Sequence, residues 1–123
     1  MKCTLPVLVV EDSFLIAASL EDALLEAGHP VTLARSVAEA EAAMADTEFA
    51  AALLDYMLPD GDSLSLARQL HASGCKVAVV SGVDREVVPS DGAIAALFDK
   101  PTDERDLIAW VGEVTGTPQA KVA

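Results

Sequence analysis

Short apolar runs alternate five times with segments of helical periodicity, and this alternation limits the possible folds more than any other feature of the sequence. The first run, residues 5–10 (LPVLVV), is continuous and rich in valine, a pattern typical of a strand covered on both faces in a parallel sheet. Four more runs follow at residues 29–34 (HPVTLA), 49–57 (FAAALLDYM), 76–82 (KVAVVSG) and 94–100 (IAALFDK). The sequence therefore predicts βαβ units with right-handed crossovers and a parallel sheet between helical layers.

Residues that start and stop helices lie between these runs. The expected caps and stops are Ser13 with Gly28, Ser36 for a helix over 37–45, Asp62 or Ser63 with Gly74, and Thr102 or Asp103 for the last helix. The segment 83–93 is less regular, because Pro89 and Gly92 interrupt it. We therefore expect the fourth helix to be short or irregular.

The chain has the length of one domain, with 123 residues of which 52% are hydrophobic. We expect a single domain over 1–123, with a core at about 5–115 and a frayed tail at 116–123. No apolar run approaches the roughly 18 residues of a membrane helix, and no signal peptide is apparent. Cys3 and Cys75 belong to no metal-ligand or redox pattern, which favours a reducing cytoplasmic setting and a packing role for both.

The net charge of −12 comes from 20 acidic against 8 basic residues. Such a charge opposes binding to the phosphates of nucleic acids, so we expect no direct nucleic-acid partner and no membrane partner. Solubility explains much of this acidity, but not the position of two adjacent carboxylates, Glu11 and Asp12, directly after a buried strand.

Chemically capable side chains follow four of the five predicted strands. They are Glu11 and Asp12 after the first, Asp55 after the third, Ser81 after the fourth and Lys100 after the fifth. Ligands of open α/β sheets bind at the carboxyl ends of the strands, which selects this set. Three carboxylates held at about 4 to 6 Å repel one another by a few kcal/mol per pair, so a cation is expected among them, and Mg²⁺ prefers such oxygen ligands.

Each of these residues also has a simpler explanation when taken alone. Acids are common at helix N-termini, an aspartate such as Asp55 often initiates a turn, and Lys100 would be ordinary on a surface. Their coincidence at four strand ends favours a site. A carboxylate nucleophile, a metal, a hydroxyl and a lysine are what phosphoryl transfer to an aspartate requires.

Four motifs resemble those of the receiver domain of bacterial two-component response regulators. They are VLVVEDS, LLDYMLPDGDS, VVSG and FDKP, in the order of that family and at near-family spacings, from Val7 to about Val114. The resemblance implies a flavodoxin-like (βα)₅ three-layer sandwich with parallel strand order 2-1-3-4-5.

The same resemblance implies a role for each site residue. Asp55 would accept a phosphoryl group from a histidine kinase or a histidine phosphotransfer protein. Asp12 and Asp55 would bind Mg²⁺ directly, together with the backbone carbonyl of Met57, and Glu11 would act mostly through water. The remaining expectations are that Ser81 hydrogen-bonds the phosphoryl group, that Lys100 pairs with it, and that Pro101 holds the next loop, often with a cis peptide bond.

The sequence departs from the family pattern in one region. The aromatic switch position, three residues before the lysine, is Leu97, and Phe98 should point to the opposite face of its strand. The short interval from Ser81 to Lys100 resembles that of an atypical group of single-domain receivers in alphaproteobacteria, named for a Phe-Ala-Thr-Gly motif. VVSG keeps the glycine of that motif but not its Phe or Thr.

Two alternative functions belong to other classes. A small phosphatase working through an aspartyl phosphate, like the haloacid-dehalogenase group, would need Asp-x-Asp, but the second residue after Asp55 is Met57. A pseudo-receiver would be a scaffold that is not phosphorylated, which the complete set of site residues argues against. We expect no enzyme beyond self-catalysed phosphorylation and dephosphorylation, and an output made through contacts with another protein.

Overall fold

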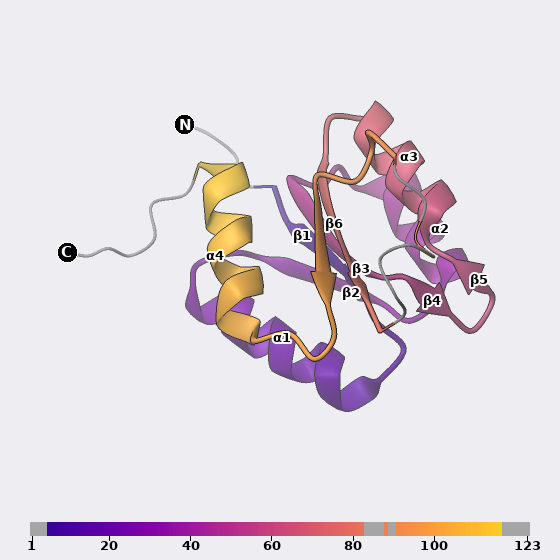
Figure 1. The fold of residues 1–123 in the computed structure, drawn as a ribbon. Helices are drawn as coiled ribbons and strands as arrows, with labels where there is room; N and C mark the ends of the chain where they lie inside the picture. Colours follow the sequence, from indigo (N-terminus) through magenta and orange to yellow (C-terminus); the bar gives the residue numbers. More distant parts are fainter. Residues whose placement is uncertain (1–4, 83–87, 89–90, 117–123) are drawn as a thin grey trace.

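The computed structural model describes residues 5–82, 88 and 91–116 and contains one parallel five-stranded sheet flanked by helices (Figure 1). The strands of this sheet are β1 (Val7–Val10), β2 (Val31–Ala34), β3 (Ala51–Asp55), β6 (Lys76–Ser81) and β7 (Ala96–Asp99). Their spatial order is β2-β1-β3-β6-β7. Since β6 and β7 are the fourth and fifth strands of this sheet along the chain, the predicted order 2-1-3-4-5 is confirmed.

Among the described residues, four helices cover the two faces of the sheet. They are α1 (Phe14–Glu26), α2 (Val37–Asp46), α3 (Leu64–Ala72) and α4 (Glu104–Thr115). Figure 1 shows α1 and α4 on one side of the sheet and α2 and α3 on the other. The central strands β1 and β3 are buried along their whole length, which explains why their sequences are continuous apolar runs rather than alternating ones.

Two hydrophobic cores lie on the two faces because successive strand residues point in opposite directions. Leu54 belongs to the core under α2 and α3, whereas its neighbour Leu53 belongs to the core under α1 and α4. Leu97 and Phe98 of β7 divide in the same way, so the expectation that Phe98 faces away from the position of Leu97 is confirmed.

The predicted caps are largely confirmed. The Ser13 hydroxyl accepts from the Ile16 amide, that of Ser36 from Glu39, and the Asp103 carboxylate from Arg105. Ser63 occupies the N-cap position of α3 but makes no capping bond with its side chain; Asp62 accepts from the Leu64 amide instead. Of the two residues predicted for this cap, the aspartate therefore supplies the bond.

The segment LPDGDS forms more structure than the turn that its composition indicates. Residues Met57–Leu58 (β4) and Gly61–Asp62 (β5) pair as a two-stranded antiparallel hairpin directly after the third strand of the main sheet. Gly61 has a φ of 141°, which side chains with a Cβ rarely adopt. The turn formers of this segment therefore close a hairpin.

Some boundaries and placements differ from the prediction. The last strand begins at Ala96 rather than 94, because the Ile94 amide donates to the Asp91 carbonyl in a turn. The second strand begins at Val31 rather than 29; His29 lies in the loop before it, is buried at 3% exposure, and burial lowers its pKa.

The predicted fourth helix falls mostly outside the described residues, as does Cys3. Residues 88 and 91–95 contain no helix. Cys75 is buried, and burial raises its pKa to about 12, as suits a packing residue. Within the described ranges, none of the helices has both the length and the hydrophobicity of a membrane span.

Candidate functional site

The acidic residues predicted at the strand ends meet because β1 and β3 are neighbours in register. Val10 lies opposite Leu54, so the residues that follow each of them reach the same edge of the sheet. Glu11 is fixed there by two hydrogen bonds. Its amide donates to the Ala34 carbonyl at 3.0 Å, and its Oε2 accepts from the Ser13 amide at 3.0 Å.

Glu11, Asp12 and Asp55 form a compact carboxylate cluster. Each offers one oxygen, and these three oxygens lie within 4.8 Å of one another. Glu11 and Asp55 are buried, at 5% and 8% exposure, whereas Asp12 is exposed. The cluster is therefore a recess with an open acidic rim, and its oxygen donors suit a hard divalent cation such as Mg²⁺.

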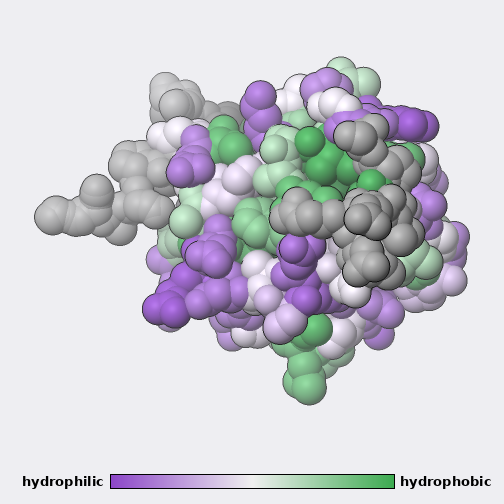
Figure 2. Space-filling view, in the orientation of Figure 1, coloured by the Kyte–Doolittle hydropathy of each residue, from purple (hydrophilic) through white to green (hydrophobic). Residues whose placement is uncertain are grey.

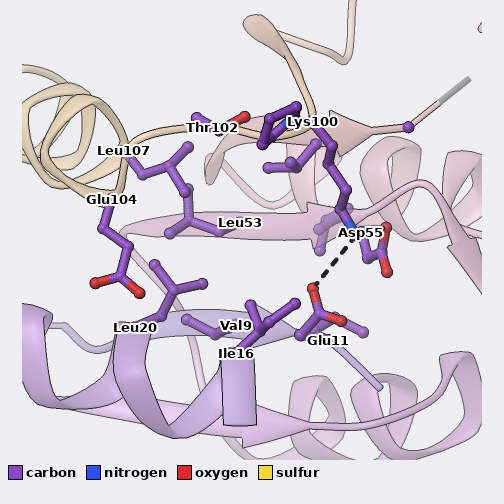
Figure 3. A pocket seen from close by; sticks show the side chains of 15 residues that line it. Val9, Glu11, Ile16, Leu20, Leu53, Asp55, Lys100, Thr102, Glu104 and Leu107 are labelled. Atoms are coloured by element: carbon purple, nitrogen blue, oxygen red, sulfur yellow. Dashed lines mark ion pairs between the residues drawn. The ribbon is translucent and has the colours of Figure 1, made fainter. Parts of the chain in front are cut away.

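Lys100 extends from the end of β7 into this cluster. Its Nζ lies 3.2 Å from Asp55 Oδ1 and 3.8 Å from Glu11 Oε1 (Figure 3). The Lys100 amide donates to the Ser81 carbonyl at 2.8 Å, and the Lys100–Pro101 peptide bond is cis. The lysine predicted after the last strand thus lies beside the carboxylates that follow the first and third strands.

Burial raises the pKa of both inner carboxyls. For Asp55, the ion pair with Lys100 opposes this effect and the charge of Asp12 adds to it; for Glu11, the Ser13 amide opposes it and the charge of Asp55 adds to it. The net upward direction shows that burial outweighs the favourable contacts of each carboxylate, including those with Lys100. A further cation would favour the charged forms.

Ser81 and Met57 lie near the cluster on its other sides. Val80 is opposite Asp55 in the β3–β6 pair, so Ser81 lies one residue beyond the level of Asp55, and it is buried at 2% exposure. Met57 starts β4, two residues after Asp55, and its side chain is 55% exposed. All six predicted site residues therefore belong to the carboxyl edge of the sheet or to the hairpin that leaves it.

Asp60 is a residue that sequence reasoning did not single out. Its two carboxylate oxygens accept from the amides of Val37 and Ala38, at 2.8 and 3.0 Å. These two bonds hold its pKa below the usual range. The hairpin after Asp55 is thereby tied to the first turn of α2. The partner amides are 23 and 22 positions away, so no local pattern could have identified them.

A cavity of about 580 Å³ opens beside the cluster, between α1 and the start of α4 (Figure 3). Glu11, Asp55 and Lys100 line one end of it. Apolar side chains make most of the remaining wall. Leu20 and Leu107 have the helical spacing of ordinary core residues, and this spacing does not reveal the space between them.

Comparison with known proteins supports one family. The sequence profile of the response regulator receiver domain matches residues 7–111. Among individually curated proteins, none matches the chain significantly.

Solved structures of receiver domains are similar over nearly the whole chain. A CheY-like receiver domain from Methanospirillum hungatei JF-1 is 27% identical, with a TM-score of 0.84 over 93% of this chain and 95% of that one. One from Methylobacillus flagellatus is 25% identical, with a TM-score of 0.77 over 91% and 99%. The Francisella response regulator 1452 receiver domain shares the fold at 24% identity, with a TM-score of 0.81 over 91% and 97%. None of these comparisons tests the Phe-Ala-Thr-Gly subgroup, which stays a prediction.

Proposed function

The chain belongs to the response regulator receiver domain family, and from that premise we propose that it accepts a phosphoryl group on Asp55 and thereby switches its contacts with another protein. One observation carries this proposal. The Lys100 ammonium lies 3.2 Å from Asp55 Oδ1, inside a cluster whose three carboxylates otherwise repel one another. No observation favours a phosphatase with external substrates or a pseudo-receiver.

The phosphoryl donor is a phosphohistidine on a sensor kinase or a histidine phosphotransfer protein. An Asp55 carboxylate oxygen attacks phosphorus, a P–O bond forms, and the P–N bond breaks with its electron pair returning to the imidazole, which then takes a proton. Lys100 pairs with the new phosphoryl oxygens and the Ser81 hydroxyl donates a hydrogen bond to one of them. The phosphoryl group adds a charge of about −1.5 to −2, which changes the balance of charge that Lys100 must compensate.

Mg²⁺ fits this site because the donor set consists of three carboxylates, each with an oxygen within 4.8 Å of the others, and such oxygens are its preferred ligands. Asp12 and Asp55, with the Met57 carbonyl, would hold the ion, and Glu11 would act mostly through water. When bound, Mg²⁺ supplies positive charge that neutralises the phosphoryl oxygens. Asp55 remains the nucleophile, and Lys100 remains the protein's own cation at the site.

The remaining proposals concern the whole chain. Residues 1–123 act as one receiver, with the core at about 5–115, in the cytoplasm and without direct contact to nucleic acid or membrane. Its chemistry is confined to gaining and losing its own phosphoryl group. The output is made by protein contact.

Intact-mass spectrometry after incubation with Mg²⁺ and acetyl phosphate tests the acceptor. We expect one phosphoryl group that survives acid and is lost in base. Asp55→Asn should abolish the label, and EDTA should prevent it. Asp22→Asn, which removes an exposed carboxylate from α1, is the matched control and should label normally.

Two outcomes decide between the functions. Failure of the wild type to label, with acetyl phosphate and with a phosphorylated kinase alike, would exclude a phospho-accepting receiver and leave a scaffold. Rapid turnover of unrelated phosphate esters would indicate the phosphatase instead. A label that persists in Asp55→Asn would show that another residue is the acceptor.

A further inference from the structure

The cavity between α1 and α4 continues from the carboxylate cluster into an apolar chamber. Its floor is formed by Val9 and Leu53 of the sheet, and its walls by Leu20 of α1 and Leu107 of α4. A volume of about 580 Å³ lies within the range of small-molecule sites, which are mostly apolar with a few polar groups that orient the ligand. The chamber therefore has the size and lining of a ligand site.

Glu104 adds a polar group at the far end of this chamber. It is the first residue of α4, lines the cavity and is only partly exposed. Figure 3 shows its carboxylate at the end of the view opposite Asp55 and Lys100. Within residues 5–82, 88 and 91–116, the Glu104 carboxylate has neither a hydrogen bond nor an ion pair. Among the described residues, none therefore competes with a ligand for this carboxylate.

The charged side chains that line the cavity indicate which class of ligand it can bind. Glu11 and Asp55 already share the Lys100 ammonium, whereas Glu104 has no cation among the described residues. An anionic ligand would meet excess negative charge, in a protein of net charge −12. The helix dipole at the start of α4 disfavours a cation, but this effect is weaker than a charge-assisted hydrogen bond to a partly buried carboxylate. A small cation is the charge that fits.

We propose that this cavity binds a small hydrophobic amine, with its apolar body between Leu20 and Leu107 and its ammonium on the Glu104 carboxylate. The site is distinct from phosphoryl acceptance. The ligand would nevertheless lie against the wall that holds Asp55 and Lys100, so its presence is able to alter the acceptor.

Three probes of matched shape test the ligand class on unphosphorylated ¹⁵N-labelled protein. They are phenethylamine, 2-phenylethanol and 3-phenylpropionate, each titrated by NMR. We expect amide shifts confined to α1, the start of α4 and the ends of β1 and β3, with a Kd for the amine of about 1 mM or below. The alcohol should bind at least about 10-fold more weakly, and the carboxylate should show no saturation.

Two pairs of variants test the residues. Glu104→Gln should weaken amine binding about 10-fold, whereas Glu113→Gln, an exposed glutamate further along α4, should leave it unchanged. Ile16→Trp adds bulk to a half-exposed residue that lines the cavity, and should block binding. Leu15→Trp, at its more exposed neighbour that does not line the cavity, should not.

Several results would overturn the proposal. They are equal binding of amine and alcohol, amine binding that survives both Glu104→Gln and Ile16→Trp, and the absence of saturable shifts for the amine up to about 10 mM. Circular dichroism of each variant separates lost binding from lost folding. Since none of these measurements uses phosphorylation, failure here leaves the assignment of Asp55 untouched.

Discussion

The two faces of the sheet are built from the same strands but are packed differently. On one face, α2 and α3 cover a core that also includes the aromatic residues Phe49 and Tyr56. On the other, α1 and α4 cover a smaller core, and the cavity lies between them near the carboxylate cluster. A smaller hollow of about 360 Å³ lies between α2 and α3. The two faces therefore differ in the size of their cores and of their cavities, and the face with the smaller core and the larger cavity adjoins the candidate site.

Polar contacts reinforce the face covered by α2 and α3. Asp60 of the hairpin accepts from the first amides of α2, and the Gln69 side chain of α3 donates to Glu41 of α2 at 3.1 Å. On the cavity face, α1 and α4 approach each other through aliphatic side chains such as Leu20 and Leu107. A change of ligand or charge at the site is therefore expected to act first on α1 and α4.

The largest effect on stability is expected at two adjacent leucines of β3 whose side chains face opposite sides of the sheet. Leu54→Ala removes a fully buried side chain from the larger core and should lower the free energy of unfolding by about 4 kcal/mol. Leu53→Ala should cost less, about 2 to 3 kcal/mol, because its side chain packs in the smaller of the two cores and so has fewer buried neighbours to lose. Urea unfolding monitored by circular dichroism measures both.

This pair is internally controlled, since the two substitutions are chemically identical and lie on one strand. Equal costs for the two variants would contradict the packing difference. A larger cost for Leu53→Ala would reverse it.

Much of the site could be predicted because its residues follow strands in the sequence. A parallel sheet brings the carboxyl ends of its strands to one edge, so Glu11, Asp12, Asp55 and Lys100 could be grouped without coordinates. The alternation of apolar runs with helical segments predicted a parallel sheet between helical layers, and the family resemblance of the motifs implied its strand order.

The remaining features depend on distances that no local pattern encodes. The contact of Asp60 with α2 requires the hairpin to form first, and turn composition alone did not reveal that hairpin. The cavity depends on how far apart Leu20 and Leu107 are held, although each has the periodicity of an ordinary core residue. Ile16 shows the same limit, because its spacing before Leu20 is that of a core residue, whereas the structure exposes it at 44%.

A smaller effect on the free energy of unfolding tests whether charge repulsion, and not packing alone, destabilises the cavity face. Without Mg²⁺ at neutral pH, Asp55→Asn should raise the free energy of unfolding by about 1 kcal/mol, as the Lys100 ion pair offsets most of a repulsion of a few kcal/mol. Since the folded protein raises the pKa of Asp55 and Glu11, it binds their protons more tightly than the unfolded chain does. The stability from these protons is present below the unfolded pKa and is lost as pH rises through the folded one.

Urea midpoints of wild type and Asp55→Asn, measured from acidic to neutral pH, test the direction of this pH dependence of stability. The gap between the two proteins should widen as the pH rises and should shrink when Mg²⁺ is added to the wild type. Asp22→Asn should track the wild type throughout. If the wild type were more stable than Asp55→Asn at neutral pH without metal, charge repulsion would not destabilise this face, and its packing alone would be responsible.

The smallest effect is local and concerns the face covered by α2 and α3. Asp60→Ala removes the acceptor of two α2 amides, so the amides of Val37 and Ala38 should exchange with solvent faster while later amides of α2 keep their protection. Because those bonds lower the pKa of Asp60, its contribution is present above the unfolded pKa and is lost as pH falls through the folded one. Hydrogen exchange followed by NMR measures this.

Asp62→Ala is the matched control, because Asp62 lies in the same hairpin and accepts from the Leu64 amide of α3 rather than from α2. It should accelerate exchange at the start of α3 and leave Val37 unchanged. If Asp60→Ala left the exchange of Val37 and Ala38 unaltered, the hairpin would not hold α2, and the firmness of this face would rest on its apolar core alone. If it loosened the whole of α2, the hairpin would be a direct link from the residues beside Asp55 to an entire helix of the opposite face.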